Sequence, residues 1–305
     1  MSHLIIVILI GMIIRNTYGV PRWATAGIET NKLWLEAGIV VMGASVALDR
    51  VISAGPMILL CVVITVVATI VTVEVLARGL FGIRDKIGSL LAAGSGICGV
   101  SAVVATARSI EANERQIAYA AATILLFDTV TLFVYPVIGH VLGLSDMVFG
   151  IWAGLTMFST GPVTAAGFAF SRAAGEWALL VKLTRNSLIG VAAIGYALYY
   201  IRKSGENTTQ KVVPGSWSYL WESFPKFVLG FIEVLLIANT GLLTQAQLAS
   251  LEHASNWLFL FAFAGLGLEI RLDELRSTGF EPVLVVLVSL VGMSIATLFV
   301  LIHLF

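Results

Sequence analysis

Asp128 carries the most demanding chemistry in the sequence. It lies at the centre of the apolar run LLFDTVTLF, and on an ideal helix it would be about 18 Å from either end of the surrounding segment. A carboxyl group in an apolar span has to pair with a cation, coordinate one or take up a proton. We predict that a proton or a sodium ion couples to transport at Asp128. A structural salt bridge, or a neutral hydrogen-bonded acid, is the alternative.

Three further ionisable residues lie inside apolar runs. Lys182 and Arg185, in LLVKLTRNSLIG, are three residues apart and would share one helix face. A guanidinium binds an oxoanion through two parallel hydrogen bonds, so Arg185 and its neighbour Asn186 are predicted substrate-binding residues. Neutralisation of Asp128 by Arg185 is an equal alternative. Lys182, together with Glu233 in FVLGFIEVLLIAN, is predicted to take part in ion coupling.

Glycines cluster in the middle of the apolar segment 87–107, which contains LLAAGSGICGVSAVVATA. Glycine costs about 1 kcal/mol against alanine inside a helix, and non-helical backbone at bilayer depth needs surrounding protein or water. The cluster predicts two half-helices, the second with amide groups that bind an anion. Close packing of an unbroken helix through small residues is the alternative. The predicted substrate-binding residues here are Ser95, Gly96, Cys98, Gly99 and Ser101.

A second interruption is predicted in segment 147–173, which contains FSTGP. Pro162 lacks an amide donor and its ring clashes with the preceding turn, so the helix cannot run through undisturbed. The segment is long enough for a hairpin, and Ser159 and Thr160 would offer hydroxyl groups to the substrate. A proline-kinked helix without functional meaning is the alternative. Gly265 and Gly267 give a weaker indication of a third unwound stretch.

The composition indicates the class of fold that positions these residues. Of 305 residues, 58% are hydrophobic and 12% are charged, and the mean hydropathy is +0.97, whereas a soluble domain is about half apolar and a quarter charged. We predict an all-α polytopic membrane protein with one integrated transport domain: segments within 1–201, a polar cytoplasmic linker at 202–222, and three segments within 223–305. The ten predicted segments are 3–14, 33–48, 56–77, 87–107, 116–140, 147–173, 178–201, 223–240, 256–270 and 282–304.

Lys and Arg residues predict the orientation. If all ten segments cross, Arg50, Arg108, Arg115 and Arg172 lie on one face, and the other Lys and Arg residues outside the segments lie on the opposite, cytoplasmic face. Both termini are then outside. Re-entrant segments 87–107 and 147–173 fit the rule as well, so charge leaves both topologies open.

An internal similarity suggests an inverted repeat. Residues 48–55, LDRVISAG, match residues 272–279, LDELRSTG, at Leu, Asp, Ser and Gly. With ten crossings the two copies run in opposite directions, as in transporters built from inverted repeats. Coincidence between two helix-end motifs in an apolar chain is the alternative.

Several classes of protein find no support in the sequence. The formal net charge is zero, so nucleic acid is not a predicted partner. Cys61 and Cys98 are 37 positions apart in apolar runs and indicate neither a disulfide framework nor a metal site. No nucleophile triad, Walker loop or HExxH motif is present, so we predict no enzyme activity and no cofactor.

Several longer stretches resemble the YeiH-type sulfate exporter family of membrane proteins. GxGICGxSAV and KLxR are its most specific motifs here. The similar stretches cover nearly the whole chain and are 35–48, 92–106, 149–167, 180–190, 225–239 and 262–270. The resemblance implies a fold related to bile-acid/sodium symporters and cation–proton antiporters, with inverted five-helix repeats, discontinuous helices and elevator or rocking-bundle transport, often as homodimers. It also implies one more N-terminal helix than residues 3–14 provide.

The chain departs from that family at two places. Met157-Phe158-Ser159, followed by Pro162, stands where the family typically has Ile-His-Asp/Glu and then Gln. Asp128 stands where the family commonly has a small residue. An acid shifted from one segment to another implies that coupling or substrate differs from that of the relatives.

Together these features predict a multi-pass protein of the cell membrane that transports a small anion, such as sulfate or a sulfonate, coupled to protons or sodium. A cation–proton antiporter using Asp128 is the second hypothesis, and a non-transporting membrane protein is the third. The predicted partners are the anion, the coupling ion, the lipid bilayer and a second copy of the chain. Sodium next to Asp128 is the one metal ion that the sequence suggests.

Overall fold

The computed structural model describes residues 2–20, 27–28, 30–46, 48–83, 85–204, 221, 226–270 and 280–304, and every regular element in these ranges is a helix. Four of the described helices are long and apolar enough to span a bilayer: Gly55–Leu80, Glu114–Val141, Arg172–Tyr200 and Phe280–Leu304. The predicted all-α membrane fold with discontinuous helices is confirmed. The elements are α1 (Ser2–Thr17), α3 (Asn31–Met42), the 3₁₀-helix η1 (Gly43–Ser45), α4 (Leu48–Val75), the π-helix η2 (Leu76–Leu80), α5 (Asp85–Gly96), α6 (Val100–Ser109), α7 (Glu114–Val141), α8 (Asp146–Thr156), α9 (Thr160–Phe170), α10 (Arg172–Asn186), α11 (Ile189–Ser204), α13 (Phe227–Asn239), α14 (Gln245–Glu269) and α16 (Phe280–Leu304).

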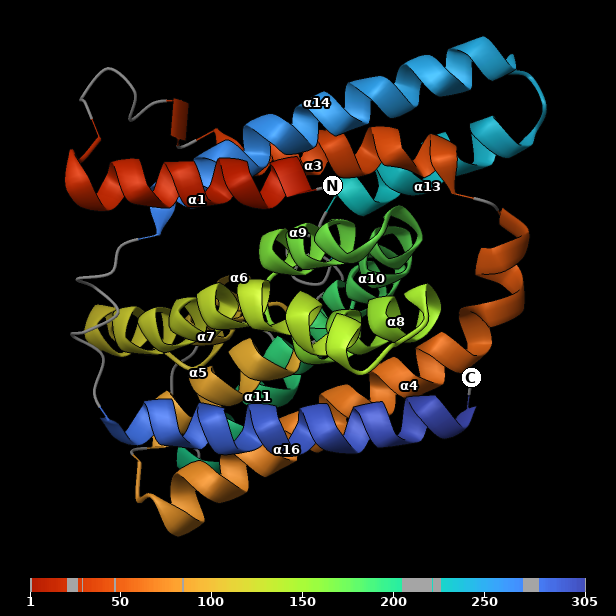
Figure 1. The fold of residues 1–305 in the computed structure, drawn as a ribbon. Helices are drawn as coiled ribbons and strands as arrows, with labels where there is room; N and C mark the ends of the chain where they lie inside the picture. The colour runs from red at the N-terminus through yellow and green to blue at the C-terminus, as the bar shows by residue number, and fades with distance from the viewer. Residues whose placement is uncertain are drawn as a thin grey trace.

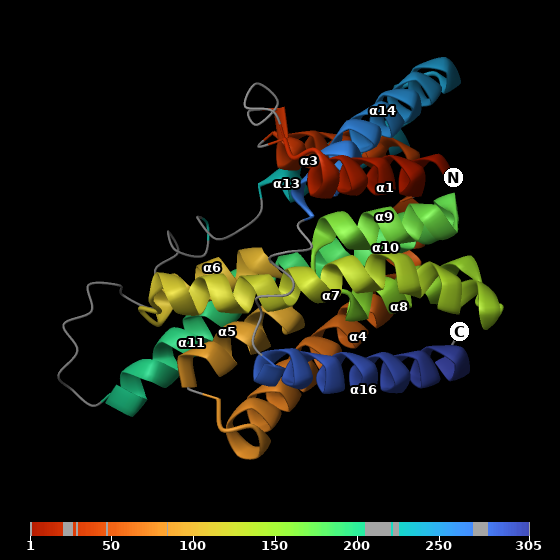
Figure 2. The same ribbon diagram turned by 60° about the vertical axis from the view of Figure 1, so that its left-hand side comes forward.

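The helices form two layers (Figure 1, Figure 2). We call α1, α3, α13 and α14 the panel, and α4 to α11 together with α16 the core. Helix α9 is a core element that packs against α1 and α14 of the panel. The rings of Phe168 in α9 and Phe259 in α14 lie 5.2 Å apart, centroid to centroid. The last three predicted segments therefore divide between the layers, since α13 and α14 belong to the panel and α16 to the core.

Small residues allow the panel helices to approach closely. A Cβ on Gly267 of α14 would lie 2.3 Å from the carbonyl oxygen of Ile8 in α1, and one on Gly265 would lie 2.5 Å from Cβ of Asn31 in α3. Helix α14 runs without a break from Gln245 to Glu269. The prediction of a third unwound stretch is therefore wrong, and these glycines serve helix packing instead.

Helices α5 and α6 fold back on each other as a hairpin, which we call hairpin 1. Nζ of Lys86, near the start of α5, donates to the carbonyl oxygen of Glu111, just after α6, at 2.8 Å. In one straight helix these residues would be about 37 Å apart. Segment 87–107 therefore enters and leaves on the same face of the protein.

Helices α8 and α9 form a second such unit, hairpin 2. The rings of Phe149 at the start of α8 and Phe170 at the end of α9 stack with centroids 4.0 Å apart. Along a straight helix they would be separated by about 32 Å. Because the 28-residue helix α7 connects the two hairpins, they enter from opposite faces. Figure 2 shows hairpin 1 on the left and hairpin 2 on the right, the side where α1 begins and α16 ends.

The hairpins change the predicted distribution of charge. Arg108 and Arg115 now follow hairpin 1 on the face where it entered, whereas with ten crossings they would lie on the other face. Arg50 and Arg172 are then the Lys and Arg residues between segments on the hairpin 2 face. The positive-inside rule predicts, with a stronger bias than before, that the hairpin 1 face is cytoplasmic.

Two sequence predictions fall mostly outside the described residues. The second copy of the internal similarity, 272–279, lies outside them. So does the linker 202–222, apart from residues 202–204 at the end of α11 and Trp221.

The hairpin topology predicts opposite labelling of two cysteine variants. In a background with Cys61 and Cys98 replaced by alanine, Arg115→Cys should react with an impermeant maleimide from the cytoplasmic face, and Asp146→Cys should react from outside. Both side chains are exposed in the structure. Lys32→Cys is cytoplasmic in either topology and serves as the control. Crossing segments would reverse the labelling of Arg115→Cys and Asp146→Cys, and that result would refute the hairpins.

Candidate functional site: two hairpin tips held by buried charges

The tips of the two hairpins meet inside the core. Tip 1 is Ile97–Gly99 and tip 2 is Met157–Ser159. Gly99 has φ of +70°, and a Cβ added to it would lie 2.0 Å from Oγ of Ser159. Only glycine fits, because both the backbone conformation and the approach of Ser159 exclude a side chain. The glycine that interrupts segment 87–107 thus also allows the contact between the tips.

Arg185 of α10 binds the last carbonyl groups of both first half-helices. Its Nη1 donates to the carbonyl oxygens of Gly154, Leu155 and Met157 at 3.0, 2.7 and 2.9 Å. Its Nη2 donates to those of Ser95 and Gly96 at 3.0 and 2.8 Å. The side chain is fully buried. The carbonyl groups that a helix leaves without partners at its C-terminus are thus bonded, and the cation offsets the negative ends of the α5 and α8 dipoles.

Lys182, one helical turn before Arg185, binds the tips themselves. Its Nζ donates to the carbonyl oxygens of Ile97 at 2.8 Å and Met157 at 3.2 Å, and also to that of Phe158. The side chain is 0% exposed. Lys182 and Arg185 do share a helix face, as their spacing predicted. Both are directed at backbone carbonyl groups of the hairpins.

Asp128 of α7 binds hairpin 2 at the start of its second helix, α9, whereas Arg185 binds the end of its first helix, α8. Its Oδ1 accepts a hydrogen bond from the backbone N–H of Ser159 at 2.9 Å, and the side chain is 2% exposed. Ser159 is the N-cap of α9, so the carboxylate lies at the positive end of that half-helix. The other oxygen, Oδ2, has no hydrogen-bond partner among the described residues. Asp128 thus has one oxygen that holds tip 2 and one that remains available.

The cluster holds two basic side chains and one acidic side chain. When Lys182, Arg185 and Asp128 are all ionised, two cations face one carboxylate and the formal sum is +1. The dipoles of each hairpin contribute about half a negative charge at the end of its first helix and half a positive charge at the start of its second, so they cancel in this sum. Asp128 compensates the start of α9, whereas Gly99, the N-cap of α6, has no side chain to cap that helix. The start of α6 is therefore the positive end left without a carboxylate.

The remaining predicted residues fall into two groups. Nδ2 of Asn186 donates to Oγ1 of Thr160 at 3.0 Å, which joins α10 to the start of α9. Cys98 is buried within tip 1 and Ser95 is buried just before it, while Ser101, in the first turn of α6, is exposed. Glu233 is separate from these residues: its side chain is exposed on α13, which packs against α3 and η1 in the panel.

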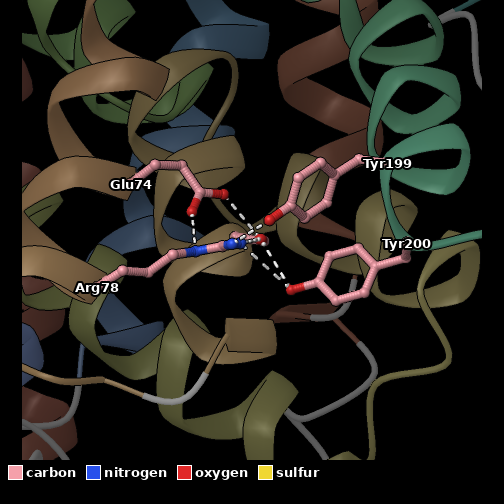
Figure 3. A network of polar contacts seen from close by, with 5 residues as sticks. Glu74, Arg78, Tyr199 and Tyr200 are labelled. Atoms are coloured by element: carbon pink, nitrogen blue, oxygen red, sulfur yellow. Dashed lines mark hydrogen bonds and ion pairs between the residues drawn. The ribbon is translucent and has the colours of Figure 1, made fainter. Parts of the chain in front are cut away.

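A polar network at the outer end of hairpin 1 was missed by the sequence analysis (Figure 3). Arg78 of the π-helix η2 pairs with Glu74, Nε to Oε2 at 2.6 Å, and donates from Nη1 to the hydroxyl of Tyr199 at 2.5 Å. Ser89 of α5 accepts from Nη2 of Arg78 at 2.9 Å and donates to Oε1 of Glu74 at 2.7 Å. Its Oγ also lies 3.1 Å from the hydroxyl of Tyr200.

One sequence signal was available for part of this network. Glu74 and Arg78 are four residues apart, which is the spacing of a helical ion pair. The partners on α5 and α11 could not be foreseen, because they lie 11 to 122 positions away in the chain.

Arg185 should be required for folding. Arg185→Ala leaves five carbonyl oxygens of two helix ends without their charged donor, and we expect it to lower the free energy of unfolding by at least about 3 kcal/mol. Arg185→Lys should have an intermediate effect, since an ammonium group cannot span both helix ends. Thermal unfolding in detergent measures this, with the exposed Arg115→Ala as the control. A melting temperature of Arg185→Ala equal to that of the parent would contradict the role.

Comparison with known proteins places the chain in a family. The family model described as conserved hypothetical protein 698 matches residues 1–286. A UPF0324 membrane protein of Nitratidesulfovibrio vulgaris is 32% identical over 281 residues, which cover 92% of this chain and 78% of that protein. One of Bacillus cereus is 31% identical over 296 residues, covering 97% and 82%. No solved structure matches the chain. These matches show that the chain belongs to the conserved hypothetical protein 698 family, alongside the UPF0324 membrane proteins.

Proposed function

We propose that this protein is a secondary transporter of a small anion, coupled to protons or sodium through Asp128. The observation that carries the proposal is the buried cluster at the hairpin tips, where Lys182 and Arg185 outnumber Asp128. An uncompensated charge in a low-dielectric interior costs several kcal/mol, so a monovalent anion bound beside the cluster would be stabilised. Holding the hairpin tips does not by itself require that the basic side chains outnumber the acidic one.

The start of α6 is the position that suits the anion best. Its dipole end is positive, and its N-cap Gly99 makes no side-chain cap hydrogen bond. Arg185 contributes charge from a distance, since its Nη groups are bonded to carbonyl oxygens. The anion-binding role first considered for Arg185 is therefore proposed for the α6 amides, with the hydroxyl of Ser101 in the same turn as a further donor.

Asp128 would couple the anion to a cation. Uptake of a proton or sodium ion by its carboxylate raises the formal charge of the cluster from +1 to +2 and weakens the hold on the start of α9. Both changes favour an anion near the tips, so the anion and the coupling ion would bind together. The resemblance to YeiH-type proteins implies sulfate or sulfonates as the anion.

A cation–proton antiporter is the second candidate. It is favoured by Oδ2 of Asp128, which has no hydrogen-bond partner among the described residues, next to a lysine that would compete for the carboxylate. The two candidates differ in their need for an anion. An antiporter exchanges protons for cations whichever anion is present, whereas the proposed carrier moves its coupling ion only when its anion is supplied.

Reconstituted protein tests both candidates. Proteoliposomes should accumulate radiolabelled sulfate, or the best anion of a panel including sulfonates and chloride, when a proton or sodium gradient is imposed. Cation exchange that proceeds equally with a large inert anion such as gluconate would overturn the anion proposal in favour of antiport. Absence of any solute movement under every gradient would support a non-transporting protein.

Asp128→Asn should abolish the dependence on the coupling ion while the protein still folds. The amide retains an oxygen that accepts from the N–H of Ser159, but it cannot take up a proton or balance a sodium ion. We expect gradient-driven uptake to fall at least about tenfold, measured in the same liposomes. Asp146→Asn, on the exposed start of α8, is the matched control. Unchanged pH and sodium dependence in Asp128→Asn would remove the coupling role.

A further inference from the structure

We propose that one face of α6, formed by Ser101, Ala105 and Arg108, lines a water-filled path from the cytoplasmic surface to tip 1. The path deepens the proposed function and rests on it for the identity of the solute. Its existence, however, is a statement about water access that can be tested without any transport assay.

The exposure pattern of hairpin 1 defines this face. Ser101 and Arg108 are exposed and Ala105 is half-buried, at spacings of four and three residues, which place them on one side of a helix. The other side of α6 is buried through Ala102, Val103, Thr106 and Ala107. From Ser101 to Arg108 the rise is about 10.5 Å, so the face connects the depth of the tip with the end of the hairpin.

Hairpin 2 has no comparable face. All residues of α8 from Val148 to Thr156 are buried, and so are those of α9 from Gly161 to Phe168. The hairpin that enters from the cytoplasmic face is thus open along one side, and the hairpin that enters from outside is enclosed. This asymmetry gives the path its direction: the structure is open toward the cytoplasm and closed toward the outside.

The amide groups at the start of α6 need water as a hydrogen-bond acceptor at this depth in the bilayer. In α6 the amide of Ala102 donates to the carbonyl oxygen of Gly99 at 3.1 Å, whereas the amides of Val100 and Ser101 have no acceptor within the helix and Gly99 supplies none from a side chain. Lipid cannot accept these hydrogen bonds, so at bilayer depth such backbone persists only beside protein or water. An exposed serine in the same turn is also costly in hydrocarbon. Water reaching Ser101 satisfies both groups.

The position of α6 and the charge of Arg108 fit a route for an anion. In both views α6 lies on the side of the core that faces the panel, as does α9 (Figure 1, Figure 2). Ser159 of tip 2, which touches Gly99, and Thr160, the first residue of α9, are both half-buried. Arg108 at the cytoplasmic end attracts anions, and the positive start of α6 lies at the inner end. The path would therefore favour anions along its length.

Labelling of single cysteines tests the path. In the background without Cys61 and Cys98, Ser101→Cys should react with a charged methanethiosulfonate reagent in inside-out vesicles and not in right-side-out vesicles. Two controls bracket it: Ala102→Cys on the buried side of α6, and Val291→Cys, which is 47% exposed on the apolar face of α16. Neither should react, because a charged reagent needs a thiolate in water. The path is refuted if Ser101→Cys reacts no faster than Val291→Cys, or only from outside.

Substitution of Arg108 tests whether its charge attracts anions into the path. With Ser101→Cys as the reporter, Arg108→Gln should slow an anionic methanethiosulfonate about threefold or more and leave a cationic one as fast or faster. Arg115→Gln, at the exposed start of α7, should change neither rate. Equal effects of both substitutions would show general surface charge and would overturn the assignment of Arg108 to the path.

Anion protection separates this inference from the proposed function. Labelling from the cytoplasm establishes the path by itself. Slower labelling in the presence of sulfate, with no slowing by gluconate, would support anion binding at the start of α6. Labelling that sulfate and the other anions of the panel leave unchanged would support the path and count against the anion as its solute.

Discussion

Backbone groups at the ends of interrupted helices must be bonded within the protein, and the rest of the core follows from that constraint. Two hairpins end in the middle of the structure, where α5 and α8 would leave carbonyl oxygens facing each other. Arg185 and Lys182 donate to these oxygens in both hairpins. Asp128 accepts a hydrogen bond from the amide at the start of α9. Three buried charges thus replace the water that such helix ends would otherwise need.

The same arrangement connects stability with function. A cluster that only held the tips would gain from balanced charge, yet this one has two cations for one carboxylate. The start of α6 is the helix end that receives no carboxylate, and it is also the place where the core is exposed at Ser101. Charge excess and accessibility coincide there, which is why the proposals on the anion and on its route converge on hairpin 1.

Hairpin 1 is held at both of its ends. At the tip Arg185 binds the carbonyl oxygens of Ser95 and Gly96, and at the outer end Ser89 joins the network of Glu74 and Arg78. Arg78 lies in the π-helix η2, and π-helical turns are often found at functional positions. Helix α5 is therefore fixed between two polar anchors, while α6 keeps one face open. The fixed half positions the tip, and the open half provides access to it.

The sequence by itself determined that the chain is a helical membrane protein, that segments 87–107 and 147–173 are interrupted, and that Asp128, Lys182 and Arg185 are ionisable residues within apolar runs. These properties are local: apolar length sets a span, the Gly-Ser-Gly cluster and Pro162 interrupt helices, and a charge in an apolar run must find a partner. The sequence did not reveal whether the chain continues or turns back after a break, which depends on contacts such as Lys86 with Glu111 and Phe149 with Phe170. Nor did it reveal that Arg185 binds backbone carbonyl groups of both hairpins. Only the tertiary structure decided these points, because the partner of a buried charge is whatever distant backbone the fold brings beside it.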